Sequence, residues 1–376
     1  MRTADDVFCI ISIEKGVIME SLIESALKNT GRLPEEQKVE KMDDRIRICV
    51  VGVGGAGCNT ISRLARMGIK SADTIAINTD HKHLQITEAD KRLLIGKSIT
   101  RGLGAGGFPE IAMKCAEASR DKLREVLAGS ELVFIAAGMG GGTGTGAAPI
   151  VAEVAKEQGA IVVAIVTYPF SLERARIQKA EWGLEQLKKT TDTVVVIDNN
   201  RLVSYVPNLP MNQAFAVADE VTARAVKGIS DTIMFPSLVN IDFADIRAIM
   251  GNAGVSIISV GEGKGTDKVT SVVHNTLEHP LLDVDYTGAK GALIHISGGP
   301  QLTLGEATQI GEGLTSSFDP NANVIWGARL SPEMGNDVVV TAIMTGITSP
   351  HVLGKIKEDQ KALNKMSLEI DSIQYL

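Results

Sequence analysis

The chain has 376 residues and a hydrophobic content of 44%, which is enough for two ordinary domains with buried cores. Its net charge of −7 and its lack of basic runs interleaved with aromatics argue against nucleic acid as a partner. The four cysteines have no Cys-x-x-Cys spacing, so they predict no metal site and are typical of a reduced cytoplasmic protein. The apolar runs are strand-length, so we expect no insertion into a membrane.

Residues 1–45 are expected to form an N-terminal extension. Apolar residues at helical spacing after Met19 predict one helix, and the charged stretch from Glu35 to Arg45 predicts a solvated linker. Because Met19 opens the helical pattern, residues 1–18 are either a mispredicted start or a disordered leader.

Residues 46–211 alternate between buried strands and amphipathic helices, the first of which is expected from Asn59. Continuous runs of β-branched residues separated by helices indicate a parallel sheet that is covered on both faces. We therefore predict a doubly wound α/β domain. Its strands are expected at Ile46–Val51, Thr74–Ile77, Leu132–Ala137, Ile161–Val166 and Thr193–Ile197.

A long central helix is predicted over residues 212–234, with apolar residues on more than one face, as in a helix between two domains. Residues 235–348 then predict a smaller α+β domain. Its helices are expected at Phe243–Met250, Lys268–Leu277 and Leu304–Thr315, and its strands at Val255–Val260, Ala292–Ile296, Asn323–Trp326 and Asp337–Ile343. Residues 349–376 form a tail that ends in the apolar residues Leu368, Ile370, Ile373 and Leu376.

Three glycine-rich segments indicate a phosphate site. Gly52–Gly57 follows a strand and fits the GxGxxG fingerprint, which alone, with Asp80 after the next strand, would favour a dinucleotide-binding oxidoreductase. A dinucleotide fold has no use for the second segment, Gly138–Gly146, which precedes a helix expected near Ala147. Successive glycines there let backbone N–H groups converge on phosphate oxygens. The third segment, Arg101–Gly107, is suited to close around a terminal phosphate, so the three predict a mononucleotide polyphosphate site.

Five segments carry a likeness to a known family: Gly54–Asn59, Asn78–Asp80, Gly140–Gly146, Thr167–Phe170 and Asn240–Asp245. From about residue 46 to 347 the chain resembles the FtsZ branch of the tubulin/FtsZ superfamily, with the archaeal type as one candidate. The resemblance implies a tubulin/FtsZ-like fold and a GTP-hydrolysing cytoskeletal protein. Such a protein polymerises head to tail into the filaments of the septal ring at mid-cell.

The resemblance also implies the nucleotide contacts. Phosphates would be held by the glycine segments, the ribose side by Glu173 and Arg176, and guanine by Asn199, Phe215 and Asp219. Mg²⁺ would be held mainly through phosphates and water. The implied binding residues are Gly54, Gly55, Ala56, Gly57, Cys58, Asn59, Gly106, Gly107, Gly141, Gly142, Thr143, Gly144, Thr145, Gly146, Glu173, Arg176, Asn199, Phe215 and Asp219.

Two of these assignments have alternatives. The family usually has three residues between the glutamate and the arginine, whereas two separate Glu173 from Arg176, so Arg174 remains open. Asp219 can accept hydrogen bonds from guanine N1–H and N2–H but would face an acceptor at adenine N1, which favours GTP over ATP. The alternatives are that Asp219 only caps or solvates a helix, and that Phe215 is simple core.

The catalytic carboxylates are expected outside the glycine segments, which offer no side chain to activate water. Asp242 and Asp245 are the candidates, and they follow a helix expected at about Asn212–Ile229, whose 18 residues would span about 27 Å. We therefore expect the next molecule in a head-to-tail filament to supply them. The alternatives are that both only cap the following helix, or that the protein is a GTP-dependent scaffold without significant hydrolysis. The tail is expected to bind membrane-anchoring or regulatory division proteins.

Overall fold

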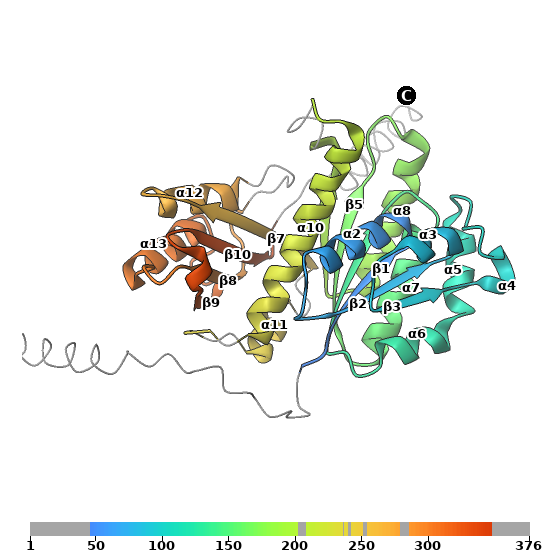
Figure 1. The fold of residues 1–376 in the computed structure, drawn as a ribbon, viewed down its shortest axis with the longest axis horizontal. Coiled ribbons are helices and arrows are strands. Elements are labelled where there is room, and N and C mark those ends of the chain that lie inside the picture. Colours follow the sequence, from blue (N-terminus) through green and yellow to red (C-terminus); the bar gives the residue numbers. More distant parts are fainter. Residues whose placement is uncertain are drawn as a thin grey trace, which may run out of the picture. The chain divides into compact units, whose positions relative to one another are not determined.

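The computed structural model describes residues 46–201, 208–235, 237–239, 242–250, 254–278 and 286–347 (Figure 1). Across these ranges the strands form one sheet with the order β3-β2-β1-β4-β5-β6-β7-β10-β8-β9. The expected N-terminal helix and the C-terminal tail lie outside the described residues.

The first six strands of this sheet are parallel and run in the order β3-β2-β1-β4-β5-β6. This is a doubly wound order, so the predicted α/β fold is confirmed. The sheet reverses its direction of winding between β1 and β4, which is where such folds bind ligands. The strands are β1 Ile48–Val53, β2 Asp73–Asn78, β3 Lys91–Leu94, β4 Leu132–Gly138, β5 Ile161–Tyr168 and β6 Thr193–Asp198.

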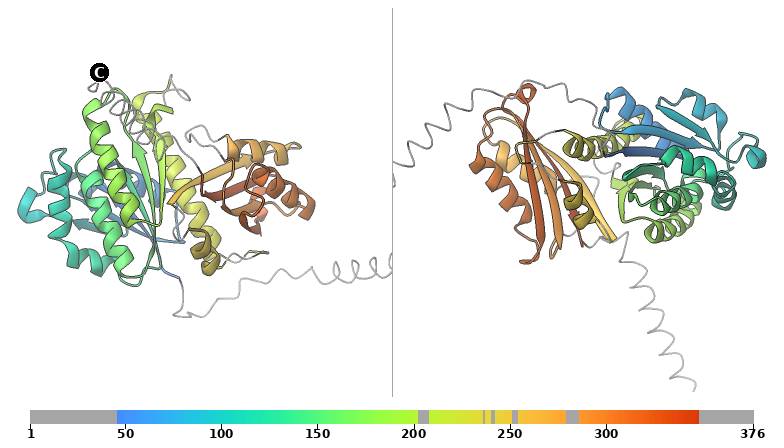
Figure 2. Two further views of the ribbon diagram at one scale, coloured as in Figure 1. Left: turned by 180° about the vertical axis from the view of Figure 1, so that it is seen from behind. Right: turned by 90° about the horizontal axis from the view of Figure 1, so that it is seen from below.

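Helices cover both faces of the parallel sheet (Figure 2). On one face, Val50 of β1 joins the same core as Ile61 of α2, and on the other face Val51 joins the core that contains Val151 of α7. Adjacent residues of a strand point to opposite faces, so one apolar run supplies two cores. The helices of this domain are α2 Gly54–Arg66, α3 His81–Ile86, α4 Lys97–Thr100, α5 Pro109–Glu117, α6 Arg120–Leu127, α7 Thr143–Glu157 and α8 Arg174–Thr190.

The central helix, α10, runs from Met211 to Met234 and contacts α2, β7 and β10. Ala223, Val226 and Ile229 are buried on it. The helix contacts α2, which covers the parallel sheet, and also the later strands β7 and β10. Its sequence is therefore apolar on more than one face.

The C-terminal part is a mixed sheet covered by helices, which confirms the predicted smaller α+β domain. Strand β10 lies antiparallel to both β7 and β8, and β9 lies parallel to β8. Helix α13 begins with a capping box formed by Thr303 and Glu306. The elements are α11 Phe243–Met250, β7 Gly254–Gly263, α12 Lys268–Leu277, β8 Gly291–Gly298, α13 Leu304–Thr315, β9 Asn323–Leu330, a 3₁₀ turn Pro332–Met334 and β10 Val338–Thr345.

The two helices that follow the glycine-rich segments begin earlier than the sequence indicates. Helix α2 begins at Gly54 rather than Asn59, and α7 begins at Thr143 rather than near Ala147. Glycine has a low helix propensity, so its clusters predict loops. Here close packing requires the glycines: a Cβ on Gly57 would lie 2.2 Å from the carbonyl oxygen of Ala136.

Candidate functional site

A cavity of about 430 Å³ lies at the carboxyl ends of the central parallel strands. Its walls come from the starts of α2 and α7, from the residues after β5 and β6, and from the first turns of α10. Many of the predicted nucleotide-binding residues line it together. They are Gly55, Ala56, Asn59, Gly141, Gly142, Thr143, Gly144, Glu173, Arg176, Asn199, Phe215 and Asp219.

Two glycine segments meet at one end of this cavity. A Cβ on Gly54 would lie 2.8 Å from the backbone nitrogen of Gly144, so only glycine fits there. The hydroxyls of Thr79 and Thr143 are 2.7 Å apart and join the residue after β2 to the start of α7. The N-termini of α2 and α7 therefore open on the same space, where their free N–H groups and helix dipoles favour an anion.

Thr145 stabilises the turn formed by the second glycine segment. Its side chain is fully buried, and its hydroxyl oxygen accepts a hydrogen bond of 2.9 Å from the Gly140 N–H. Thr145 therefore fixes the turn and does not line the cavity, in contrast to Thr143.

The third glycine segment packs behind the second. A Cβ on Gly142 would lie 3.2 Å from the Cα of Gly107, and Lys179 Nζ donates to the Gly107 carbonyl at 2.6 Å. Gly106 and Gly107 both have positive φ, which glycine adopts without strain. The segment thus supports the phosphate end of the cavity, although Gly106 and Gly107 do not line it.

Acceptors and an aromatic ring also line the cavity. Phe215 is 40% exposed and its ring meets Phe170 edge to face at 5.8 Å, so one face stays available for stacking. The Asn199 Oδ1 atom is buried and has no hydrogen-bond partner in the described part of the chain. Unpaired buried acceptors are rare, so this atom indicates a ligand donor in the cavity.

Asp219 lies one helical turn after Phe215 on α10. Burial raises the pKa of its carboxyl to about 6, while a hydrogen bond from Thr60 and the charge of Arg63 act to lower it. The group is therefore mainly ionised at neutral pH and offers only acceptors to the cavity.

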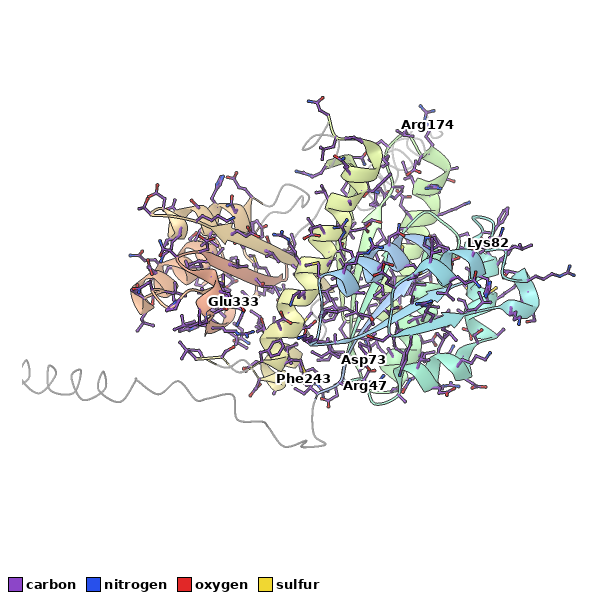
Figure 3. All side chains as sticks on the ribbon, viewed as in Figure 1. Arg47, Asp73, Lys82, Arg174, Phe243 and Glu333 are labelled. Carbon is purple, nitrogen blue, oxygen red and sulfur yellow. The ribbon has the colours of Figure 1, made fainter. Side chains whose placement is uncertain are left out.

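Glu173 and Arg176 form an ion pair of 2.7 Å at the start of α8. Glu173 also accepts a hydrogen bond from the Phe170 N–H at 3.2 Å, which holds its carboxylate at the cavity wall. Arg176 lines the cavity, whereas Arg174 does not and extends outward from the first turn of α8 (Figure 3).

The other predicted residues lie outside the cavity lining. Gly54, Gly57 and Gly146 are packing positions, and burial raises the pKa of the Cys58 thiol to about 11. Asp242 and Asp245 lie at the start of α11, beyond the C-terminal end of α10 (Figure 1). Asp219 precedes Met234, the last residue of α10, by 15 positions, which is a rise of about 22 Å, so these carboxylates lie far from Asp219.

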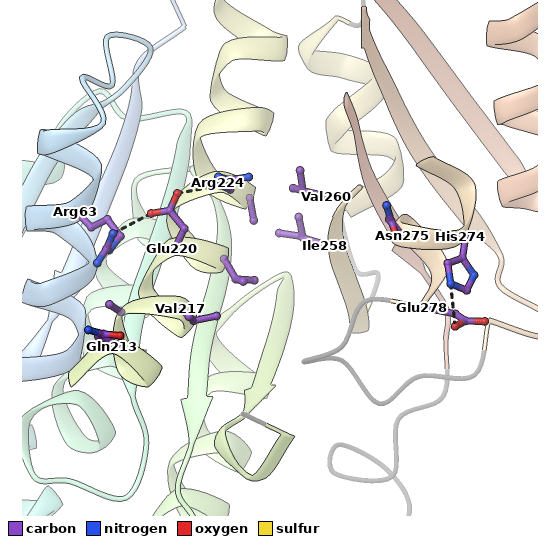
Figure 4. Close-up of a pocket in the computed structure, with 13 residues that line it drawn as sticks. Arg63, Gln213, Val217, Glu220, Arg224, Ile258, Val260, His274, Asn275 and Glu278 are labelled. Atoms are coloured by element: carbon purple, nitrogen blue, oxygen red, sulfur yellow. Dashed lines mark hydrogen bonds and ion pairs between the residues drawn. The ribbon is translucent and has the colours of Figure 1, made fainter. Parts of the chain in front are cut away.

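The structure adds residues that the sequence did not indicate. Thr60 lines the first cavity one position after Asn59 and is buried. Its only signal in the sequence is a hydroxyl residue on an amphipathic helix. A second cavity of about 810 Å³ lies beside α10 and is lined by residues of α2, α10, β7 and α12 (Figure 4). On its wall Glu220 pairs with both Arg63 and Arg224. No sequence motif marks this cavity.

Comparisons with known proteins agree with this geometry. Residues 47–207 match the GTPase domain of the Tubulin/FtsZ family, and residues 254–348 match the C-terminal domain of the FtsZ family. The chain belongs to the tubulin/FtsZ family. It is 60% identical over 326 residues to cell division protein FtsZ 2 of Methanocaldococcus jannaschii, covering 86% of each chain. It is 50% identical over 355 residues to cell division protein FtsZ 2 of Haloferax volcanii, covering 93% of this chain and 89% of that one.

Solved tubulin/FtsZ-family structures share the fold. An empty FtsZ dimer of M. jannaschii is 49% identical, with a TM-score of 0.77 over 81% of this chain and 89% of that one. GDP-bound CetZ1 from Haloferax volcanii has a TM-score of 0.72 at 20% identity, over 85% of this chain and all of that one, which supports the fold alone. Among the described helices, none is long and apolar enough to cross a bilayer.

Proposed function

We propose that this chain binds and hydrolyses GTP and polymerises head to tail into the filaments of the cell-division ring. The observation that carries the proposal is the cavity itself, whose walls include two helix N-termini and the Asp219 carboxylate. An anion-binding part and an acceptor-only group match the phosphates and the N1–H and N2–H donors of a guanine nucleotide.

The nucleotide would lie along this cavity. The N–H groups of the two glycine turns bind the phosphates, and the Glu173–Arg176 pair lies beside the ribose. Phe215 stacks on the base, while Asn199 Oδ1 and Asp219 accept its hydrogen bonds. Adenine offers an acceptor where guanine offers a donor, so ATP gives the buried Asp219 carboxylate no hydrogen bond from the base.

Mg²⁺ fits this site only as a nucleotide-bound ion. The described residues contain no group of three or more His, Cys, Asp or Glu side chains that could hold a metal. Mg²⁺ held through phosphates and water would neutralise charge that develops on the phosphates. The glycine turns and Thr143 orient the phosphates that carry it.

We propose that a second copy completes the hydrolytic site. The second half of α10, from Thr222 to Met234, lies between the cavity and the segment that carries Asp242 and Asp245 in the same chain. A head-to-tail contact brings one copy's α11 to the next copy's phosphates, and repetition of that contact builds an open filament. Known relatives include an FtsZ dimer, which supports self-association.

The remaining assignments follow the same proposal. We divide the chain into an extension (1–45), a GTP-binding domain (46–211), a central helix (212–234), a C-terminal domain (235–348) and a tail (349–376). The tail binds membrane-anchoring or regulatory division proteins, and the filament lies at mid-cell.

Sedimentation with parallel phosphate release, in GTP, GDP and ATP, tests the proposal. We expect GTP alone to give both pelleted protein and phosphate, and turnover per molecule to rise with protein concentration because association completes the site. A specific activity that stays constant on dilution would contradict the shared site. Nucleotide-dependent sedimentation without phosphate release would identify a non-hydrolysing scaffold.

A further inference from the structure

Thr60 lies on α2 beside the Asp219 carboxylate. Its side chain is 5% exposed, and its Oγ1 lies 3.1 Å from Asp219 Oδ1. The same hydroxyl lies 3.3 Å from the carbonyl oxygen of Ala56. A threonine hydroxyl has one hydrogen to donate, so it serves one of these two acceptors at a time.

The ionised carboxylate is the stronger acceptor of the two. Donation from Thr60 to Oδ1 leaves the other oxygen, Oδ2, to accept hydrogen bonds from a ligand. A protonated Asp219 would instead present an O–H group to the guanine N1–H and N2–H groups, and two donors cannot pair. The Thr60 contact thus favours the form of Asp219 that complements guanine.

We propose that Thr60 is a positioning residue that fixes Asp219 Oδ1 and so directs Oδ2 towards the guanine base. The inference rests on the proposed contact between Asp219 and guanine. Thr60 itself acts through Asp219 and sets how strongly the cavity prefers guanine to a base that lacks the 2-amino group.

The charged groups around Asp219 are already paired with one another. Arg63 on α2 pairs with Glu220 at 3.0 Å, and Glu220 also pairs with Arg224 on α10 (Figure 4). Across the cavity, Glu173 pairs with Arg176 at the start of α8. In the described part of the chain, the Thr60 hydroxyl donates a hydrogen bond to the Asp219 carboxylate.

A pH dependence follows from this arrangement. Burial raises the pKa of Asp219 to about 6, and the Thr60 bond opposes that rise. Guanine binds the ionised form, so affinity falls as the pH drops through this pKa. Removing the hydroxyl raises the pKa further, and the fall in affinity then occurs at a higher pH.

The experiment measures GDP binding to the full chain by calorimetry, across the acidic to neutral range, for Thr60→Val and Thr60→Ser. Valine keeps the shape without the hydroxyl, and we expect GDP affinity at neutral pH to fall about tenfold with the pH midpoint shifted upward. Serine keeps the donor and should bind within about twofold of the wild type. Ser62→Ala is the matched control, because Ser62 lies on the same helix and bonds to Cys58 and Glu88 instead.

Inosine diphosphate, which lacks the 2-amino group, distinguishes positioning from packing. We expect Thr60→Val to narrow the preference for GDP over inosine diphosphate. If affinity for both falls equally and the pH midpoint does not move, Thr60 only packs the helix and the inference is overturned. If Thr60→Val unfolds below the assay temperature, Thr60→Ala is used in its place. The same two quantities are then measured: the preference for GDP over inosine diphosphate and the pH midpoint of GDP binding.

Asp219→Asn separates base recognition by Asp219 from the positioning role of Thr60. Unchanged GDP affinity in this variant would remove the guanine contact and with it the proposed base recognition. Weakened binding in Asp219→Asn together with wild-type behaviour in Thr60→Val would overturn the role of Thr60 alone.

Discussion

Asp242 and Asp245 cap each other's backbone at the start of α11. The Asp242 N–H donates to Asp245 Oδ2 at 3.1 Å, and the Asp245 N–H donates to Asp242 Oδ1 at 2.7 Å. This reciprocal pair satisfies two N–H groups that a helix start leaves free. Each carboxylate uses one oxygen in the pair, so capping and a catalytic role in a neighbouring molecule are compatible.

Asp245→Asn tests the catalytic role without removing the cap. The amide oxygen still accepts from the Asp242 N–H, but the amide cannot take a proton from water. We expect GTP-dependent sedimentation to persist and phosphate release to fall by about 100-fold or more. Asp267→Asn, at the start of α12, is the control and should hydrolyse at the wild-type rate. Wild-type turnover in Asp245→Asn would show that this carboxylate is not catalytic.

Mixing two inactive variants tests whether the site is shared between copies. Asp219→Ala should lose nucleotide affinity while its Asp245 stays intact, and Asp245→Ala should bind GTP but hydrolyse little. At a mixed contact the first variant donates Asp245 to the GTP of the second, so phosphate release should partly recover. The measurement is phosphate release against mixing ratio. An Asp245→Ala monomer that fails to bind GTP would contradict the separation of the two sites.

Deleting Met366–Leu376 tests the proposed role of the tail. Leu368, Ile370, Ile373 and Leu376 are apolar residues suited to binding a partner. We expect the truncated chain to sediment with GTP as the full chain does, yet to lose its position at the division site in cells. Loss of polymerisation or of thermal stability would indicate instead that the tail packs on the body.

Lys268→Met tests a buried ion pair in the C-terminal domain. The Lys268 side chain is 6% exposed, and its Nζ lies 3.0 Å from Glu306 and 3.1 Å from Asn336 Oδ1. Methionine keeps the apolar stem but leaves Glu306 without its cation, so we expect a loss of roughly 2 kcal/mol in the free energy of unfolding. Lys264→Met is the matched control, because that side chain is 70% exposed and should contribute close to nothing. Equal denaturation midpoints for the two variants would contradict the role of the pair.

The sequence predicted the buried strands well for a physical reason. Leu132–Ala137 is continuously apolar because both of its faces are covered, and β4 forms there as expected. Strand β3, Lys91–Leu94, was missed because it lies at the sheet edge, where its lysine and arginine are exposed. Asp80, which made the dinucleotide interpretation plausible, caps α3 by accepting from the His83 N–H.

The sequence predicted many of the residues that line the candidate site but not the contacts between them. Glycine spacing indicates which backbone approaches a phosphate, so Gly142 and Thr143 could be named in advance. Thr60 could not, because its contact with Asp219 joins residues 159 positions apart in the chain. Arg176 lines the cavity and Arg174 does not. Which arginine faces the cavity depends on where α8 begins, and the shortened spacing after Glu173 left that start ambiguous in the sequence.

The bond between Thr145 and the Gly140 N–H has a consequence for how the glycine turn moves. Gly140 has a φ of 91°, and the buried hydroxyl that holds its amide is shielded from water. Amide protons exchange with solvent only when such a bond opens, so this one is held even before nucleotide arrives. We therefore expect the Gly140 amide to be protected from exchange without nucleotide, and little of the free energy of nucleotide binding to be spent on ordering this turn.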